Sequence, residues 1–252
     1  MTPGPILVYE CPKCGALGSK RSINSGNTFG SLFWSDGYRR SPMLPDIPDL
    51  HECPTCRTPW WTSKQEPAYE EDSYGFGLLE AYYRPGPPKD RRELRATAAE
   101  SPREAAEEPP VPGPERRIRS GPVTPLVVPT EAGYYRALGL GLAENRADEA
   151  ELRVRAWWTS NDRYRNPNDG IAPHPLERSA RWRDNLEAML GLCDHVSRHY
   201  PLRAEALREL ARFDEALGEL DEDFPESLMP FVERLRTLCR RRNHSVVLHD
   251  PT

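Results

Sequence analysis

Two patterns of apolar and polar positions divide the chain. Up to residue 66, apolar and aromatic residues occur in short extended runs, such as residues 6–9 and 28–34, with turn-forming residues between them. From residue 130 onward, apolar residues recur at steps of three and four. The first pattern is typical of short strands and the second of amphipathic helices. The sequence therefore predicts a multidomain α+β protein, with a small N-terminal β domain and a C-terminal all-α domain.

The helical pattern is clearest after residue 180. One apolar seam there steps by four, three, four, three and four residues: Trp182, Leu186, Met189, Cys193, Val196 and Tyr200. We expect one continuous helix, with Cys193 as a buried thiol on its seam. His195 and His199 lie four residues apart on the flank of this helix, a spacing that suits a metal ion. Because no third ligand is evident, surface histidines are the favoured interpretation.

Other helices are indicated by the residues that begin them. Thr130 is a candidate N-cap, and a second helix is expected from about residue 148 to Trp158, followed by a turn at Asn161 and Asp162. The last helix is expected to have Ser227 as its cap. Pro230 then falls in its first turn, where the missing N–H costs nothing.

Between these two regions the chain is rich in proline. Residues 84–129 contain 11 prolines and no aromatic residue, so they cannot bury enough apolar surface to offset the loss of conformational entropy. We predict a domain over residues 1–66, a partly disordered linker over 67–129 and a helical domain over 130–252. The apolar cluster at residues 125–129 is expected to dock on a neighbour in extended form.

Charge and hydropathy limit the function classes. The 252 residues include 34 Lys and Arg against 39 Asp and Glu, a net charge of −5. Residues 1–66 have a net charge of +1 and residues 130–252 one of −4, so neither has the basic footprint of a nucleic-acid-binding domain. No run of 18 apolar residues is present, and the N-terminus lacks the features of a secretory signal. We expect a cytoplasmic protein that does not span a membrane.

The cysteines carry the strongest chemical signal. Four of the six form two Cys-Pro-x-Cys pairs: Cys11, Cys14, Cys53 and Cys56. Each pair places two sulfurs at one tight turn, and two such turns supply the four thiolates of a tetrahedral structural zinc site. Gly15 follows the first pair and can take positive φ, whereas Arg57 at the matching place is less suited to it. The sequence therefore predicts one Zn²⁺ held by these four cysteines.

Other uses of the pairs are less well supported. A redox dithiol is normally a single CxxC that opens a helix, whereas proline-rich extended sequence surrounds both pairs here. Two disulfides would need an exported protein. His51, two residues before Cys53, is a further possible ligand. Since four cysteines already complete the shell, we expect His51 to be a surface residue near the site.

Residues 5–65 resemble the zinc-ribbon class. The resemblance lies in the two cysteine turns and in the extended sequence beside each, residues 6–9 and Trp60-Trp61. The 38 residues between the turns depart from a minimal ribbon. We interpret this insert as a small sheet that covers the zinc site, with a recognition loop as the alternative. The aromatic residues Phe33, Trp34, Trp60 and Trp61 are expected to form the core, although exposed rings could stack on nucleic-acid bases.

Residues 204–217 resemble the middle of a tetratricopeptide repeat. The match consists of a small residue at Ala204, a small turn residue at Ala211, an aromatic ring at Phe213 and a small residue at Ala216. Ala204 and Ala216 would let two helices approach closely, with Phe213 filling the elbow between them. Asp223 and a single recognisable unit depart from the pattern. The resemblance implies a degenerate helical-repeat domain.

The combined layout also resembles a group of uncharacterised bacterial proteins. The shared segments are SGNTFG and WSDG in the insert, AWWTSND in the second predicted helix and FDEAL in the repeat-like stretch. This resemblance implies an architecture and no particular chemistry.

These observations favour an adaptor over an enzyme. Helical repeats bind partners on a concave face, so a protein partner is expected at the C-terminal helical domain, with the zinc ribbon as a second rigid surface. Nucleic-acid binding through the ribbon is the alternative. No nucleophile lies beside a base, and no phosphate-binding or metalloprotease motif is present. An acidic cluster of Asp36, Asp46 and Asp49 is the remaining possible catalytic feature.

Overall fold

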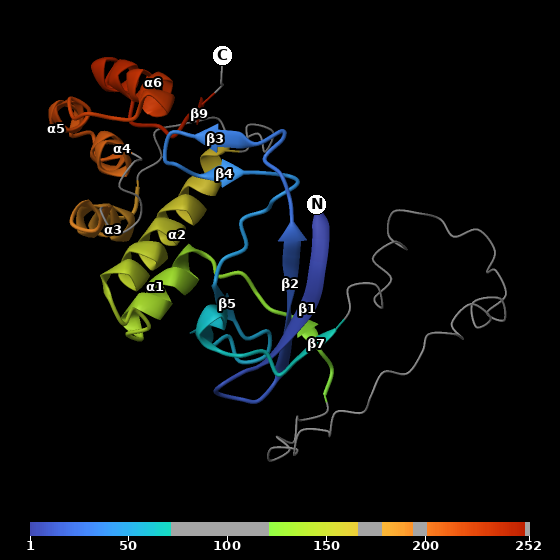
Figure 1. Ribbon diagram of the computed structural model, residues 1–252. Coiled ribbons are helices and arrows are strands. Elements are labelled where there is room, and N and C mark those ends of the chain that lie inside the picture. Colours follow the sequence, from blue (N-terminus) through green and yellow to red (C-terminus); the bar gives the residue numbers. More distant parts are fainter. Residues whose placement is uncertain (72–120, 166–177, 194–200, 250–252) are drawn as a thin grey trace, which may run out of the picture.

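The computed structural model describes residues 1–71, 121–165, 178–193 and 201–249. Within them, strands built mainly from the N-terminal region lie against helices built from the C-terminal region (Figure 1). The predicted α+β character with this order of elements is confirmed. Most of the proline-rich segment, His195 and His199 lie outside the described residues.

The largest sheet is formed by the N-terminal hairpin and two added strands. β1 (Thr2–Glu10) and β2 (Leu17–Ser25) are antiparallel, and β7 (Tyr69–Glu71) and β8 (Thr124–Pro125) extend the sheet in the order β7-β1-β2-β8. β8 runs parallel to β2, and Leu126, the residue that follows β8, is buried. A Cβ atom at Gly18 would lie 2.1 Å from Leu126 Cδ2, so this close approach needs glycine. The expected docking of residues 125–129 in extended form is confirmed.

The insert forms a second, smaller sheet. β3 (Leu32–Trp34) and β4 (Arg39–Arg40) make a hairpin whose turn contains Gly37 at φ 79°. The predicted aromatic strand is therefore present but shorter than residues 28–34. β9 (Leu248–His249), near the C-terminus, pairs with β3 and completes the order β4-β3-β9. This third strand was not predicted, because two residues carry no usable period.

A third strand pair lies beside the second cysteine turn. β5 (Leu50–Glu52) and β6 (Pro59–Trp61) are antiparallel, and the short 3₁₀ helix η1 (Thr62–Lys64) follows. All six residues of β5 and β6 are buried. Trp34, Trp60 and Trp61 are each no more than 9% exposed, which confirms that these indoles belong to the core. Phe33 was predicted with them but is 39% exposed, because it lies on the open face of the small β3–β4 hairpin.

The helices follow in sequence order along one side of the strands (Figure 1). Their bounds are α1 (Glu131–Gly139), α2 (Arg146–Arg165), α3 (Ala180–Leu190), α4 (Leu202–Glu209), α5 (Phe213–Glu219) and α6 (Met229–Arg240), with the 3₁₀ helix η5 (Glu226–Leu228) before α6. Thr130 caps α1 as predicted, since its side chain accepts a hydrogen bond from the Gly133 amide. No helix in the described part of the chain is long and apolar enough to cross a membrane.

Three local predictions about the helices are wrong. Asn161 and Asp162 lie inside α2 rather than in a turn, because Asn161 is fully buried and bonded to neighbouring elements. Ser227 lies within η5 and does not cap α6, although Pro230 is in the first turn of α6 as expected. α3 ends at Leu190, before Gly191, so Cys193 lies beyond the helix, although it is buried.

The connection between α4 and α5 matches the predicted elbow. Ala204 and Ala216 are buried in one core cluster with Phe213. Ala211, in the turn between the helices, has φ 62°, the left-handed conformation that favours glycine. The two helices therefore pack around small residues, as the sequence indicated. Their membership of a repeat series stays a prediction.

The N-terminal strands and the helices share a core. Leu50 and Trp61 pack in one buried cluster with Tyr134, Tyr135 and Leu152 from α1 and α2. In addition, Trp61 Nε1 donates to the carbonyl of Leu142 at 2.8 Å. The predicted boundaries at residues 66 and 129 stay a prediction, but the contact between the two regions is apolar and buried.

Candidate metal centre

Two turns with the same geometry carry the four cysteines. Cys11 follows β1 and Cys14 precedes β2, while Cys53 follows β5 and Cys56 precedes β6. In the first turn the Gly15 amide donates to the Cys11 carbonyl at 2.9 Å, and in the second the Arg57 amide donates to the Cys53 carbonyl at 3.0 Å. Gly15 has φ 72° and Arg57 has φ 58°. Both turns therefore need a left-handed residue directly after the second cysteine, and Arg57 adopts this less favourable conformation.

The structure brings all four predicted ligands together. Cys11 Sγ lies 3.7 Å from Cys56 Sγ, and Cys14 Sγ lies 3.6 Å from Cys53 Sγ. All four sulfurs lie within 4.8 Å of one another. Zn–S bonds of about 2.3 Å would place tetrahedral sulfurs about 3.8 Å apart. The residues present thus fit one tetrahedral metal ion with four sulfur ligands.

Hydrogen bonds and burial give the thiols unequal acidity. Burial raises the pKa of the Cys11 thiol to about 12. The hydrogen bond between Cys56 Sγ and Thr58 Oγ1, 3.2 Å long, lowers the pKa of the Cys56 thiol to about 6. The metal-free cluster is therefore partly protonated at neutral pH, and binding of a divalent metal must release protons.

An apolar shell surrounds the cluster. Cys11 and Cys53 are buried with Tyr9, Trp60 and Leu126, so residues from three separate segments enclose the sulfurs. Cys193 and Cys239 are also buried, but they pack in the helical cores and are not part of the cluster. The shell buries Cys11 and Cys53, whereas Cys14 and Cys56 stay partly exposed; a partial apolar shell of this kind limits access of water to the site.

His51 is not the surface residue that was predicted. Its side chain is 3% exposed, and its Nδ1 lies 3.5 Å from the hydroxyl of Thr62. Burial lowers the pKa of His51 to about 4, with a further contribution from Lys20. Successive side chains of β5 point to opposite faces, and both faces are covered. This explains why His51, a polar residue beside the second cysteine turn, is buried. The imidazole is not among the four clustered ligands.

Glu52 is a buried partner of the site that sequence reasoning missed. Its carboxylate is 1% exposed and pairs with Arg57 Nη2 at 2.6 Å and with Arg136 on α1. Arg136 also donates to the carbonyl of Arg57 at 3.0 Å. The residue directly before Cys53 and the one directly after Cys56 are thus joined to the same helix. Only its position beside Cys53 could have drawn attention to Glu52.

The insert, which forms a small sheet, contacts α2: Trp158 Nε1 donates to the Asp36 carbonyl at 2.8 Å, and Arg155 Nη2 donates to Asp46 at 3.0 Å. That the insert covers the metal site stays a prediction. Asp49 instead pairs with Lys20. The three aspartates therefore have separate partners, and the suggested acidic cluster is not formed.

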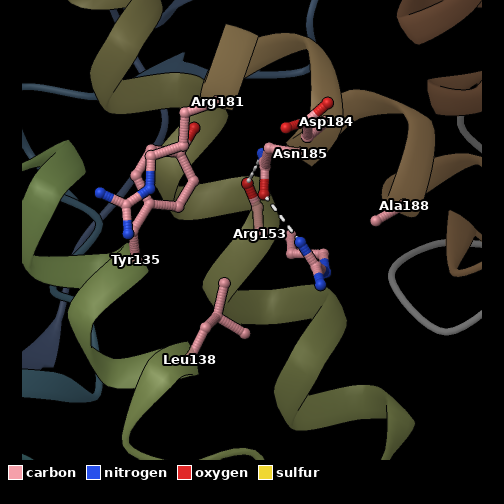
Figure 2. Close-up of a pocket in the computed structure, with 7 residues that line it drawn as sticks. All are labelled: Tyr135, Leu138, Arg153, Arg181, Asp184, Asn185 and Ala188. Atoms are coloured by element: carbon pink, nitrogen blue, oxygen red, sulfur yellow. Dashed lines mark hydrogen bonds between the residues drawn. The ribbon is translucent and has the colours of Figure 1, made fainter.

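A shallow hollow lies on the helical layer. It has a volume of about 270 Å³ and is lined by Tyr135, Leu138, Arg153, Arg181, Asp184, Asn185 and Ala188. Figure 2 shows these side chains converging from α1, α2 and α3. The Arg181 guanidinium lies 4.6 Å from the centre of the Tyr135 ring, and Arg153 donates to Asn185 Oδ1 at 3.3 Å. The hollow therefore presents fixed cations beside an aromatic ring and a carboxylate.

Comparison with known proteins places the chain in no described group. No family model matches it, and neither the curated proteins nor the solved structures contain a match.

Proposed function

We propose that this protein is a zinc-binding protein-interaction module with no catalytic activity of its own. The single observation that supports the proposal best is the four-sulfur cluster. Four thiolates fill every vertex of a tetrahedron around Zn²⁺ and leave no open position for water or substrate. Zinc at this site would hold structure rather than perform chemistry.

The position of the cluster supports a structural role for the ion. One turn belongs to the β1–β2 hairpin and the other to the β5–β6 hairpin, so a single ion would join two strand pairs. β5 and β6 also supply Leu50 and Trp61 to the core shared with α1 and α2. Zinc binding would therefore stabilise the surface on which the helices pack, and with it the arrangement of the helical layer.

The hollow between α1 and α3 is the proposed contact surface for a protein partner. Its lining combines an aromatic ring, two arginines and polar side chains, a composition common at the centre of protein interfaces. The partner we propose offers an acidic side chain or carboxylate to Arg181. We therefore propose that the helical region binds its partner at this hollow.

Nucleic-acid binding through the ribbon is the second candidate. Phe29 is 80% exposed, and Phe33 is 39% exposed and lies opposite Arg39 in the β3–β4 register, so two aromatic rings and a cation are available for stacking and phosphate contact. The indoles of Trp34, Trp60 and Trp61 are buried and cannot take part without unfolding. Two rings and so few cations favour at most weak single-strand binding.

Site-specific crosslinking tests the proposed surface. A photo-crosslinking amino acid at position 188, in the hollow, should capture one protein reproducibly in cells, whereas the same probe at position 218, on α5, should not. Arg181→Glu should abolish the capture. Arg183→Glu, the same charge change on the same helix but outside the hollow, should leave it intact. Equal capture at positions 188 and 218, or capture that survives Arg181→Glu, contradicts the proposed surface.

A further inference from the structure

A buried network of charged side chains connects segments far apart in the sequence. It joins the turn of the β3–β4 hairpin, the C-terminal half of α2, the start of the α3 segment, α4 and the residues before β9. Its charged members are three acids and three bases: Asp36, Glu205, Glu209, Arg165, Arg178 and Arg208. In Figure 1 the hairpin lies beside the C-terminal end of α2, where these segments meet. The WSDG and AWWTSND segments, which the zinc site does not use, both contribute to it.

Two of the three acids are fully matched by arginines. Glu205 accepts from Arg208 Nε at 2.7 Å and Nη2 at 2.6 Å, a two-point contact between two side chains with no exposure. Arg208 also donates to the Ser245 carbonyl at 2.9 Å. Asp36 pairs with Arg165, whose side chain is 5% exposed. These contacts neutralise both carboxylates and bind the hairpin and the C-terminal segment to the helices.

Glu209 is neutralised less well. Its only arginine contact in the described structure is a single one, Arg178 Nη2 at 3.3 Å, and Arg178 is itself held between the rings of Tyr164 and Trp182. Asn161 Nδ2 donates to Glu209 Oε1 at 3.0 Å and also to Asp36 Oδ2 at 2.8 Å. One amide group therefore lies between two carboxylates, and both carboxylates are fully buried.

We propose that Glu209 is a proton-sensitive latch, which holds the β3–β4 hairpin and the C-terminal segment against α2 and α4 while its carboxyl group is neutral. Loss of the proton places a second negative charge beside Asp36, across the shared amide of Asn161. Docking of the hairpin is then weakened, because a buried charge without full compensation is costly. The proposal does not depend on the zinc site or on the proposed partner.

Burial and the neighbouring carboxylates raise the pKa of Glu209, and the neighbouring arginines only partly offset them. Burial, and next the negative charge of Glu205, raise the pKa of Glu209 to about 8, and Asp36 also raises it. Arg178 and Arg208 oppose this rise without cancelling it. Burial likewise raises the pKa of Asp36, against the effect of Arg165. His244, the nearby titratable group of the C-terminal segment, has a lowered pKa through burial and the same two arginines, which favours its neutral form.

The sign of the pH dependence follows from this pKa. An exposed glutamate has a pKa of about 4.3, so the docked state binds more protons than the undocked state until Glu209 ionises. The docking free energy is largest at low pH and falls as the pH rises towards 8. Above about pH 8 both states are ionised and the dependence on this group ends.

Hydrogen exchange of the full chain with zinc bound tests the latch. The Ser35 amide donates to the Val247 carbonyl, and the Val247 amide donates to Ser35 Oγ, so both amides report the contact between the hairpin and the C-terminal segment. After correction for the intrinsic exchange rate, their protection should fall by up to about tenfold per pH unit from pH 6 to 8 and then level off. Amides of β1 and β2 should show no such fall. Glu209→Gln should remove the dependence, and Glu215→Gln, an exposed glutamate on α5, should retain it.

A second measurement tests the latch in the unmodified chain, so it does not depend on the folding of Glu209→Gln. In the unmodified chain, the ¹³C shift of the Glu209 carboxyl carbon should titrate with a midpoint above about 7, instead of the usual value near 4.3. A midpoint below about 6 overturns the proposal. So does protection of the Ser35 and Val247 amides that is constant from pH 6 to 8, or that falls equally in Glu209→Gln.

Discussion

Arg136 on α1 pairs with the buried carboxylate of Glu52, the residue directly before the metal-cluster cysteine Cys53. Gly133, one helical turn earlier, lies so close that an added Cβ would be 2.5 Å from Glu52 Oε1. Two features thus let α1 pack against the second cysteine turn: the ion pair between Arg136 and Glu52, and the lack of a side chain at Gly133. Stability of the metal centre and packing of the helical layer are consequently coupled.

The proposed zinc site gives the most direct prediction. Purified without chelator, the protein should contain about one zinc per chain by metal analysis, and Cys11→Ser should contain less than about half of that. Cys193→Ser removes a buried thiol outside the cluster and should keep the full content. Equal zinc in both variants would show that the metal is bound elsewhere.

Removal of zinc should affect more than the cysteine turns. Because Leu50 and Trp61 share a core with α1 and α2, a strong chelator should reduce helical circular dichroism together with the loss of zinc. Structural zinc supplies an apparent 10–16 kcal/mol in small domains. Helical signal that stays unchanged after complete zinc removal would contradict the coupling.

The contact between Arg136 and Glu52 can be tested with urea. Arg136→Ala should lower the free energy of unfolding by about 1–2 kcal/mol, since Glu52 stays buried with only Arg57 as its partner; this value is reduced for the partial exposure of Arg136. Arg163→Ala removes a 3.7 Å contact to Glu131 by a half-exposed arginine and should cost less than about 0.5 kcal/mol. Similar losses in the two variants would argue against a special role for Glu52.

The core shared by strands and helices predicts one unfolding transition. Leu50→Ala should destabilise the protein by about 2–5 kcal/mol, because Leu50 is 1% exposed in that core. Leu140→Ala, at a leucine that is 59% exposed, should change stability by less than about 0.5 kcal/mol. Unfolding curves from zinc release and from circular dichroism should coincide. Two separate transitions would mean that the regions unfold independently.

The left-handed turn between α4 and α5 predicts a stabilising substitution. Ala211 has φ 62° and is exposed, so Ala211→Gly should raise the free energy of unfolding by about 1 kcal/mol through relief of strain. Ala188→Gly makes the same chemical change inside α3 and should lower it by about 0.5–1 kcal/mol. Changes of the same sign at both positions would contradict the assigned turn conformation.

The sequence by itself determined the features that depend on neighbouring residues. Two CxxC pairs contain their own turn geometry, so the clustering of Cys11, Cys14, Cys53 and Cys56 could be predicted from spacing alone. The cap at Thr130 and the elbow at Ala211 are equally local, since a cap or a turn is formed within about four residues. The main helices could also be located from local sequence patterns, although the residues at which they end could not.

Only the tertiary structure decided which polar residues are buried and what they contact. Glu52 and Arg136 are 84 residues apart, and Asp36 and Arg165 are 129 apart, so no local pattern marks either pair. The sequence predicts His51 at the surface because four cysteines complete the metal shell, and Asn161 in a turn because Asn and Asp are turn-forming residues. Both are buried because other segments supply their partners. Burial of a polar group depends on hydrogen bonds from elements distant in sequence, and chain folding alone brings those elements together.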